Sequence, residues 1–206
     1  MAGRARDPRI DSAVLAATLE LLGEVGYPAL SMGAVAQRAG VHRPAVYRRW
    51  PSKRHLVVDA VADGLGLRPT PDTGDLRADL ITGITTVVDS LAGTPLGRVL
   101  PALVADLHTD PELSERFLDR VFHPRRATTA ATLRSAAERG EIHADFDLDF
   151  VLDALAAPLY YRILFGHLPL TRSVAEQSVD TVLASLRSGR TERAPKQDGA
   201  QTSPPE

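Results

Sequence analysis

Seven basic side chains lie within the nineteen residues AGVHRPAVYRRWPSKRHLV, Ala39 to Val57, and no acidic residue accompanies them. They are four arginines, one lysine and two histidines. The acid-free stretch is wider still, because no Asp or Glu occurs between Glu24 and Asp59. A solvated helical surface normally mixes both signs of charge. A segment of one sign therefore indicates an anionic partner, and the phosphates of DNA fit that description.

Charge is distributed unevenly along the 206 residues. Residues 1–60 carry nine Lys/Arg and five Asp/Glu, whereas residues 61–206 carry fifteen and twenty-one. The formal net charge of −2 hides this difference. A basic N-terminal third on an acidic body is the asymmetry expected when one part contacts nucleic acid and the rest has another task.

Composition excludes several classes of protein. With 44% apolar residues the chain has ample material for a core, and with no cysteine it has no disulfide, thiolate metal site or cysteine nucleophile. No run of 18 apolar residues occurs, and the N-terminus MAGRARDPRID lacks an apolar signal core. We therefore expect a soluble, unexported, cytoplasmic protein with no membrane partner, cofactor or metal.

The basic residues belong to a run of short helices. Apolar residues recur at intervals of three and four from Arg9 to Val25, and Gly26 ends that pattern. The next helix begins at Ser31, a good N-cap, and continues to Arg38. After the turn AGV, another helix is predicted from Arg43 to Arg49, and Ser52 should cap a fourth that continues to about Leu65. Two short helices joined by a glycine turn are the helix-turn-helix pattern.

The second helix of this pattern sorts into two faces. Val46 and Trp50 lie four residues apart and, with Val41, can face inward. For Tyr47 a half-buried position in the core is the alternative to an exposed one, and His42 and His55 fit surface histidines better than metal ligands. The residues left facing outward, in a position to enter a DNA major groove, are Arg43, Tyr47, Arg48 and Arg49.

Helix polarity supports the same interpretation. Arg43 opens one helix and Lys53 opens the next, although a cation near a helix N-terminus costs about 0.3–1 kcal/mol. A phosphate reverses the sign, because the exposed N–H groups and the cation then bind the same anion. We expect Lys53, Tyr47 and the Ser31 cap to contact phosphates, and Arg43 to contact a base.

The block from Ala13 to Val57 closely resembles the DNA-binding domain of the TetR family of bacterial transcriptional repressors. The shared features are the GY that closes the first helix, the VA and AGV around the turn, the central Tyr47, an aromatic residue at Trp50, and SK at 52–53. The resemblance implies base contacts from Arg43, Pro44, Ala45 and Tyr47, and phosphate contacts from Ser31, Tyr47, Arg49 and Lys53.

Two positions depart from that pattern. Where relatives commonly have a small capping residue before the recognition helix, this chain has His42, a poor N-cap. Where many relatives carry a hydroxyl, this chain has Ala45, which would offer a methyl contact, for example to thymine. The operator preference therefore does not transfer from a relative.

The acidic body is predicted to be all helical. After a Gly- and Pro-rich boundary at 64–75, helices are expected at about 75–92, 95–107, 111–139 with a break near Pro124, 147–165 and 172–187, and residues 188–206 should be a disordered tail. This gives three parts: a helix-turn-helix domain at 1–60, a helical effector-binding and dimerisation domain at 61–187, and the tail.

Two functions of the body follow from the resemblance and from its apolar residues. The resemblance implies a homodimer through the helices near 147–165 and 172–187; an ordinary central helix is the alternative. The segments 123–142 and 158–170 also resemble the C-terminal domain of an actinobacterial-type branch of the family. Prolines 101, 124 and 158 should kink helices and leave an apolar cavity for a small-molecule effector. Its aromatic and polar groups are predicted to be Phe117, Phe122, His123, Tyr160, Tyr161 and Arg162.

Taken together, these features predict a dimeric repressor that binds a palindromic double-stranded DNA operator and is released by an effector. We expect no enzyme: the chain has no phosphate loop, GxSxG or HExxH, and a lone Asp119–His123 pair is weak support for a metal. The rival interpretation is a helical effector-sensing or scaffold protein that no longer binds DNA.

Overall fold

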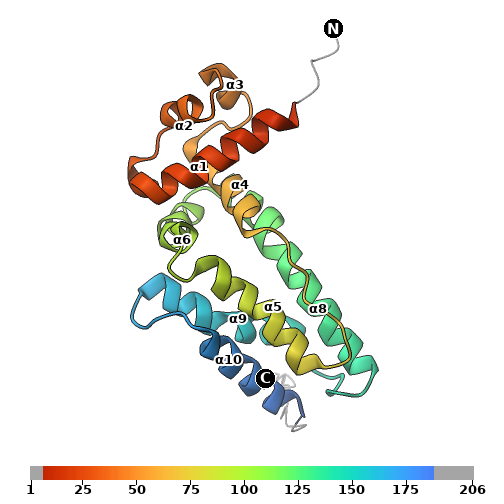
Figure 1. Ribbon diagram of the computed structural model, residues 1–206. Helices are drawn as coiled ribbons and strands as arrows, with labels where there is room; N and C mark the ends of the chain where they lie inside the picture. The colour runs from red at the N-terminus through yellow and green to blue at the C-terminus, as the bar shows by residue number, and fades with distance from the viewer. Residues whose placement is uncertain (1–6, 188–206) are drawn as a thin grey trace, which may run out of the picture.

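The computed structural model describes residues 7–187, and within that range the chain is helical with no β-strand (Figure 1). The predicted all-α fold is confirmed. Residues 188–206, predicted as a disordered tail, lie outside the described residues. The elements are α1 (Pro8–Ala29), α2 (Met32–Arg38), α3 (Arg43–Tyr47), α4 (Lys53–Leu65), α5 (Leu76–Leu91), α6 (Pro95–Leu107), α7 (Pro111–Phe117), the π-helical turn η1 (Leu118–Phe122), α8 (His123–Glu138), α9 (Leu148–Phe165) and α10 (Arg172–Arg187).

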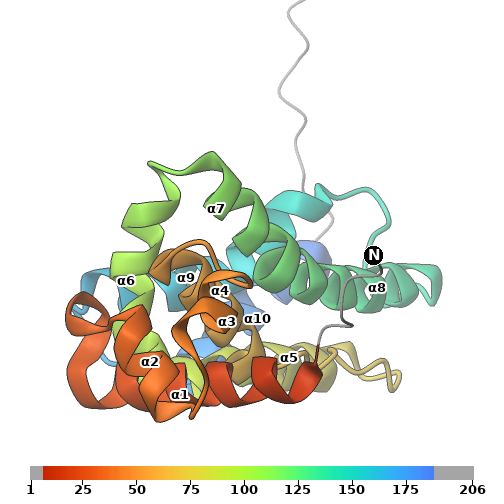
Figure 2. The ribbon, with the colours of Figure 1, turned by 90° about the horizontal axis from the view of Figure 1, so that it is seen from above.

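Helices α1, α2 and α3 form a head at one end of the molecule, and α4 leads from it into the body (Figure 1). Helix α1 is interrupted at Gly26, whose φ of 74° is in the left-handed region that glycine adopts without strain. Ser31 caps α2 as predicted, since its Oγ accepts a hydrogen bond from the Ala34 N–H at 3.2 Å. Seen from above in Figure 2, α1 and α2 lie together at one side of the head.

The second helix of the motif is shorter than predicted. Helix α3 ends at Tyr47, so Arg48 to Ser52 form the connection to α4. Ser52 stands at the N-cap position of α4 but makes no capping hydrogen bond. Its hydroxyl pairs instead with Nδ1 of His55 at 2.9 Å. That histidine is 7% exposed, so the expectation of a surface histidine at this position is wrong.

Helices α5, α8, α9 and α10 form the elongated body, with α9 and α10 side by side (Figure 1). Two cores result. One joins the head to α6 and α7, and the other lies among α5, α8, α9 and α10. The first core extends past residue 60 along α4, because Val61 and Leu65 are buried in it together with Leu103 and Leu113.

The predicted break near Pro124 is present as a change of helix type. Residues Leu118–Phe122 form a π-helical turn between α7 and α8, and Pro124, which has no N–H to donate to that turn, lies in the first turn of α8. Within residues 7–187 no single helix is long and apolar enough to span a bilayer; α5 and α6 pass that test only as a pair bent by 90°.

A buried carboxylate ties the head to the body. Asp59 of α4 is 6% exposed and accepts a hydrogen bond from the indole Nε1 of Trp50 at 2.8 Å. On its other side it accepts from Arg116 of α7 at 2.9 and 2.5 Å, and Arg120 of η1 lies 3.3 Å away. One side chain thus connects Trp50, three residues beyond the end of α3, with α7 and η1.

Replacing Asp59 by Asn should destabilise the fold by about 2 kcal/mol, because hydrogen bonds to charged groups contribute about 1.5–3 kcal/mol and the two arginines stay partly solvated. Urea denaturation followed by the fluorescence of Trp50, the only tryptophan of the chain, measures this. Asp63→Asn, at an exposed site on the same helix, is the control. Equal midpoints for both variants would show that the Asp59 contacts contribute no stability.

Candidate DNA-binding surface and ligand cavity

The outer face of α3 presents a small group of polar side chains. Val46 and Trp50 are buried, at 0% and 3% exposure, and fix this short helix against the head. Tyr47 is 53% exposed, so the alternative of a half-buried core tyrosine is wrong. Ala45 is partly covered. The exposed residues at this face are His42, Arg43, Pro44, Tyr47 and Arg48.

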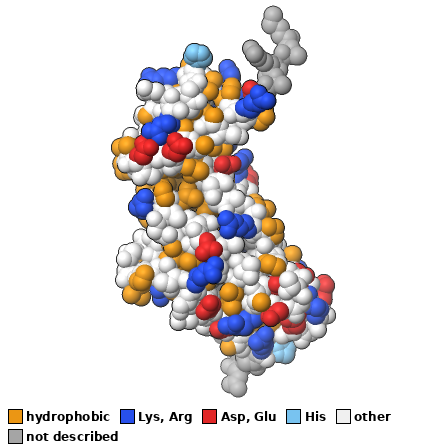
Figure 3. Space-filling model, viewed as in Figure 1, with side chains coloured by type: hydrophobic (Ala, Val, Ile, Leu, Met, Phe, Trp, Pro, Cys, Tyr) orange, Lys and Arg blue, Asp and Glu red, His pale blue; other side chains and the backbone are white. Residues whose placement is uncertain are grey.

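Acidic residues from outside the acid-free segment neutralise several of its cations. Arg38 pairs with Glu24 at 2.8 Å and with Glu20 at 3.2 Å. Arg54 lies 3.4 Å from Asp106 of α6. Figure 3 shows the result: basic side chains lie at the outer end of the head, and both signs are interspersed over the rest of that face. The segment therefore has fewer unpaired cations in the structure than its acid-free sequence indicates.

Arg49 corrects one prediction. It does not face outward but is buried at 8% exposure, where its Nε donates to the carboxylate of Asp11 in α1 and its Nη1 donates to the Ala45 carbonyl at 3.1 Å. This ion pair fastens the recognition helix to α1. Within residues 7–187, Arg43 and Arg48 are the arginines of α3 and its C-cap for which the structure gives no carboxylate partner.

Lys53 is already held by the head. Its Nζ donates to the carbonyls of Tyr27 at 3.0 Å and Pro28 at 3.2 Å, and lies 4.9 Å from the centre of the Tyr27 ring. An ammonium has three donors, so one remains for an anion. Burial and the hydrogen bond that the Tyr27 hydroxyl donates to Asp106 raise the pKa of this phenol, which keeps it neutral.

His42 and Gly33 shape the start of the recognition helix. His42 occupies the N-cap position of α3 with no capping hydrogen bond, as its poor capping ability predicts. The guanidinium of Arg43 lies across Gly33 of α2, at the place where a Cβ would stand. The absence of a side chain at Gly33 therefore leaves room for Arg43 to lie against α2.

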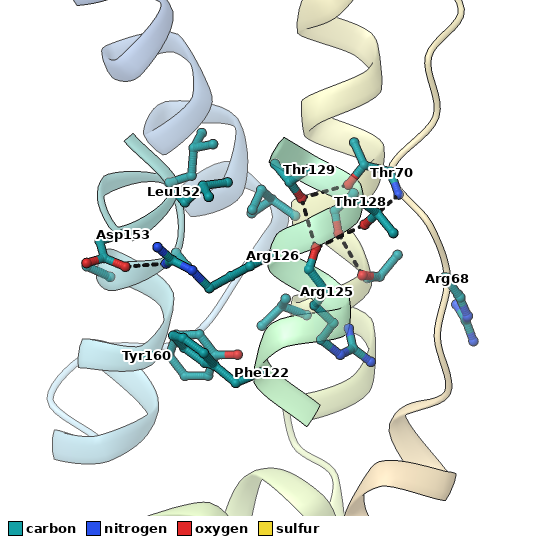
Figure 4. A pocket seen from close by; sticks show the side chains of 17 residues that line it. Arg68, Thr70, Phe122, Arg125, Arg126, Thr128, Thr129, Leu152, Asp153 and Tyr160 are labelled. Carbon is teal, nitrogen blue, oxygen red and sulfur yellow. Dashed lines mark hydrogen bonds and ion pairs between the residues drawn. The ribbon is translucent and has the colours of Figure 1, made fainter. Parts of the chain in front are cut away.

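A cavity of about 320 Å³ lies within the body. It is lined from α5, α8 and α9, from the segment before α5, and by Phe122 of η1 (Figure 4). Its apolar wall includes Ile84, Val87, Leu152 and Leu155. The volume is at the lower end of the range of about 300–1,000 Å³ that small-molecule sites occupy.

Two of the six residues predicted for an effector pocket line this cavity: Phe122 and Tyr160. The other four do not. Phe117 packs against the core of the head. His123 is exposed, Tyr161 contacts the rings of Phe165 and His167 at the surface, and Arg162 donates to the Pro169 carbonyl at 2.7 Å. Helical spacing explains this, because Tyr161 and Arg162 follow Tyr160 by about 100° and 200° around α9.

The polar lining came from segments that the sequence interpretation had not assigned to a pocket. Thr70, in the segment before α5, shares a hydrogen bond of 2.9 Å with Thr129 of α8, and its N–H donates to Thr128. Gly83 of α5 permits this close approach, because a Cβ there would overlap the Thr70 hydroxyl. The signals in the sequence are the threonine cluster ATTAAT at residues 127–132 of α8 and the glycine at position 83 inside α5.

The cavity lining carries more positive than negative charge. It includes three arginines, Arg68, Arg125 and Arg126, and one carboxylate, Asp153. Arg126 pairs with Asp153 and with Asp149, so its charge is compensated. Burial lowers the pKa of Arg125 and raises that of the neighbouring Tyr160 phenol, so the first stays charged only at an energetic cost and the second stays neutral.

The geometry defines a class of protein: a helix-turn-helix DNA-binding head attached to a helical body that contains a ligand-sized cavity. Family models agree with both parts. Residues 14–60 match the model of bacterial regulatory proteins of the tetR family, and residues 70–182 match that of the tetracyclin repressor-like C-terminal domain. The chain therefore belongs to the TetR family and is a DNA-binding transcriptional regulator.

Relatives and solved structures support this membership over most of the chain. An uncharacterized HTH-type transcriptional regulator of Bacillus subtilis, YdeS, is 30% identical, covering 79% of this chain and 82% of its own. The DNA-binding transcriptional repressor TetR of Mycobacteroides abscessus is 31% identical, covering 88% and 96%. The crystal structure of the TetR family transcription regulator SCO0332 has a TM-score of 0.71 at 34% identity, covering 85% and 97%.

Arg49→Ala should act on the fold as well as on DNA binding. Loss of the buried guanidinium leaves Asp11 without this partner and detaches α3 from α1, so we expect a loss of about 2 kcal/mol in unfolding free energy. Arg48→Ala removes a neighbouring exposed side chain and should change it by less than about 0.5 kcal/mol. Thermal unfolding of both variants, compared with wild type, separates the two roles; similar melting temperatures would contradict the burial of Arg49.

Gly83→Ala should narrow the cavity. The added methyl group displaces Thr70 from Thr129, and overpacking of this kind costs about 1–3 kcal/mol. Chemical denaturation measures this loss of stability. The control is Thr82→Ala, at the adjacent exposed position of α5. A Gly83→Ala protein as stable as Thr82→Ala would show that Thr70 can move freely.

Proposed function

We propose that the protein is a homodimeric repressor whose two α3 helices enter successive major grooves of a palindromic operator, about 34–36 Å apart. A small-molecule effector in the body cavity releases it. Arg43 is the base-reading residue, helped by Pro44 and Ala45, and Ser31, Tyr47, Arg48 and Lys53 contact the backbone. Repression is favoured because a relative, at 31% identity, is named a repressor. The proposal includes no catalytic step.

One observation carries the DNA-binding arrangement. Arg43, Tyr47 and Arg48 are exposed together on α3 and at its C-cap, and the structure gives the two arginines no carboxylate partner within residues 7–187. Every other arginine of the acid-free segment is paired with an acid. Unpaired cations beside an exposed tyrosine at the outer end of a head are suited to phosphate and to base edges.

Exposed apolar residues on α9 support the dimer. Phe150 and Phe165 are each 70% exposed, and Tyr161 and Leu164 are also exposed, although α9 buries Leu155 and Leu159 in the body. Isolated surface apolar residues are ordinary, but four large ones on the helix next to α10 form a surface that a second copy would cover. The three-part division of the chain at residues 60 and 187 is part of the proposal.

Arg43→Ala should relax discrimination at one base position of an operator selected from a random DNA pool, at a cost of about 1–3 kcal/mol. Arg48→Ala and Lys53→Ala should weaken all sequences alike and reduce the salt slope by about one each, since each removes a phosphate contact. Binding titrations between about 50 and 200 mM salt measure both effects.

The control for these titrations is Arg134→Ala, an exposed arginine of α8 far along the chain from the head. Wild-type affinity and specificity in both Arg43→Ala and Arg48→Ala would exclude α3 as the reading helix. Absence of salt-dependent DNA binding in the wild type would favour the rival function, an effector sensor that no longer binds DNA.

Phe165→Glu should convert the dimer to a monomer of 22.2 kDa, because a carboxylate would be buried without a partner in the interface. Sedimentation at micromolar concentration tests this, with Leu168→Glu, an exposed apolar residue beyond the end of α9, as the comparison. A wild-type monomer at that concentration would refute the dimer.

A further inference from the structure

The cavity in the body contains hydrogen-bond donors that the protein leaves free. Arg125 of α8 donates twice from one nitrogen, Nη2, to the carbonyls of Leu65 at 3.0 Å and Gly66 at 2.6 Å. Within the described part of the chain, its Nε and Nη1 have no hydrogen-bond partner. The same holds for the hydroxyl of Tyr160, which lies near Arg125 and lines the same cavity. A guanidinium edge and a phenol therefore remain available.

These free donors differ from the other polar groups around them. Arg126 is occupied by Asp149 and Asp153, and Figure 4 shows it extending to Asp153 on the side of α8 away from Arg68. Thr70, Thr128 and Thr129 bond to one another or to main-chain oxygens. The hydrogen-bonding groups of the lining that remain without a partner are therefore donors, and one of them is a cation. An anionic acceptor would satisfy them.

The remaining wall is apolar. Ile84 and Val87 of α5 and Leu152 and Leu155 of α9 line the cavity, with the ring of Phe122. A ligand that satisfies both parts has a compact apolar body and one acidic group. A carboxylate can accept two parallel hydrogen bonds from the Nε–Nη1 edge of a guanidinium. Its negative charge would also offset the cost of burying the positive charge of Arg125.

We propose that the effector is a small amphipathic anion, a carboxylate with an apolar body, held by Arg125 and Tyr160. The inference deepens the proposed function and rests on it, because it names the ligand class of the same cavity. It also assigns Arg125 a second role as the link to the head. The residue binds the last carbonyls of α4, the negative end of the helix that carries Asp59 and begins beside the recognition helix. A bound carboxylate would share that guanidinium with α4.

The test uses two apolar bodies, each with three head groups. Octanoate, octanol and octylamine form one series, and 4-phenylbutyrate, 4-phenylbutanol and 4-phenylbutylamine form the other. Calorimetric titration of the full chain should show each carboxylate binding at least about tenfold more tightly than its alcohol, and neither amine binding, because the lining is cationic. Equal or tighter binding of the alcohols or amines, or no binding of either carboxylate, would overturn the ligand class.

Variants identify the anchor. Arg125→Gln should weaken the carboxylates at least about tenfold and leave the alcohols within about threefold, because only the charged head group loses its partner. Arg125→Lys and Tyr160→Phe should each give an intermediate loss, which keeps the assignment testable if Arg125→Gln is unstable. Arg134→Gln, an exposed arginine on the same helix, is the matched control. Carboxylate affinity unchanged in all three cavity variants would refute the assignment.

Hydrogen exchange tests the link to α4. Octanoate should slow amide exchange in the last turn of α4, residues 62–66, in the wild type and not in Arg125→Gln. Unchanged exchange in the wild type at saturating octanoate would overturn the linking role. Binding of the ligand-free protein to its selected operator is measured in parallel. If DNA binding is retained while the carboxylate series fails, the ligand class is wrong and the regulator stands; if DNA binding itself fails, the proposed function is wrong.

Discussion

The arrangement of the molecule depends on the buried carboxylate of Asp59. A buried acid needs partners, and Asp59 finds them in Trp50, Arg116 and Arg120, which come from the head and from two body elements. The position of the recognition helix is therefore fixed relative to α7 and η1 as well as to α1. A displacement of α4 would therefore alter the hydrogen bonds that connect it to Trp50 and to α7.

Charge pairing between elements determines which cations stay free. Arg38, Arg49 and Arg54 all belong to the acid-free segment, yet each meets an acid brought from outside it. What remains on α3 is a small set of exposed groups rather than a broad basic surface. This division of roles suits a helix that contacts DNA, because the paired cations fix the head and the unpaired ones stay available to bind DNA.

The cavity and the head meet at α4. In its first turn Lys53 donates to a carbonyl of α1, its middle contains Asp59, and Arg125 from the cavity lining binds the carbonyl of its last residue. The three contacts are each between a charged group and a partner on another element. In the proposed function, DNA would act at the first end of this helix and the effector at the other, as a coupling between sites requires.

The sequence by itself determined the helices and the class of protein. Apolar spacing and caps gave the element bounds to within a few residues, because they are local properties, and the ordered motif from Ala13 to Val57 indicated the family. The sequence did not determine which polar side chains are buried or which distant residues pair. Arg49 and His55 were expected at the surface, and Phe117, His123, Tyr161 and Arg162 were assigned to a pocket that they do not line. Asp11 is 38 residues from Arg49, and Thr70 is 59 from Thr129, so only the packed tertiary structure could bring these partners together.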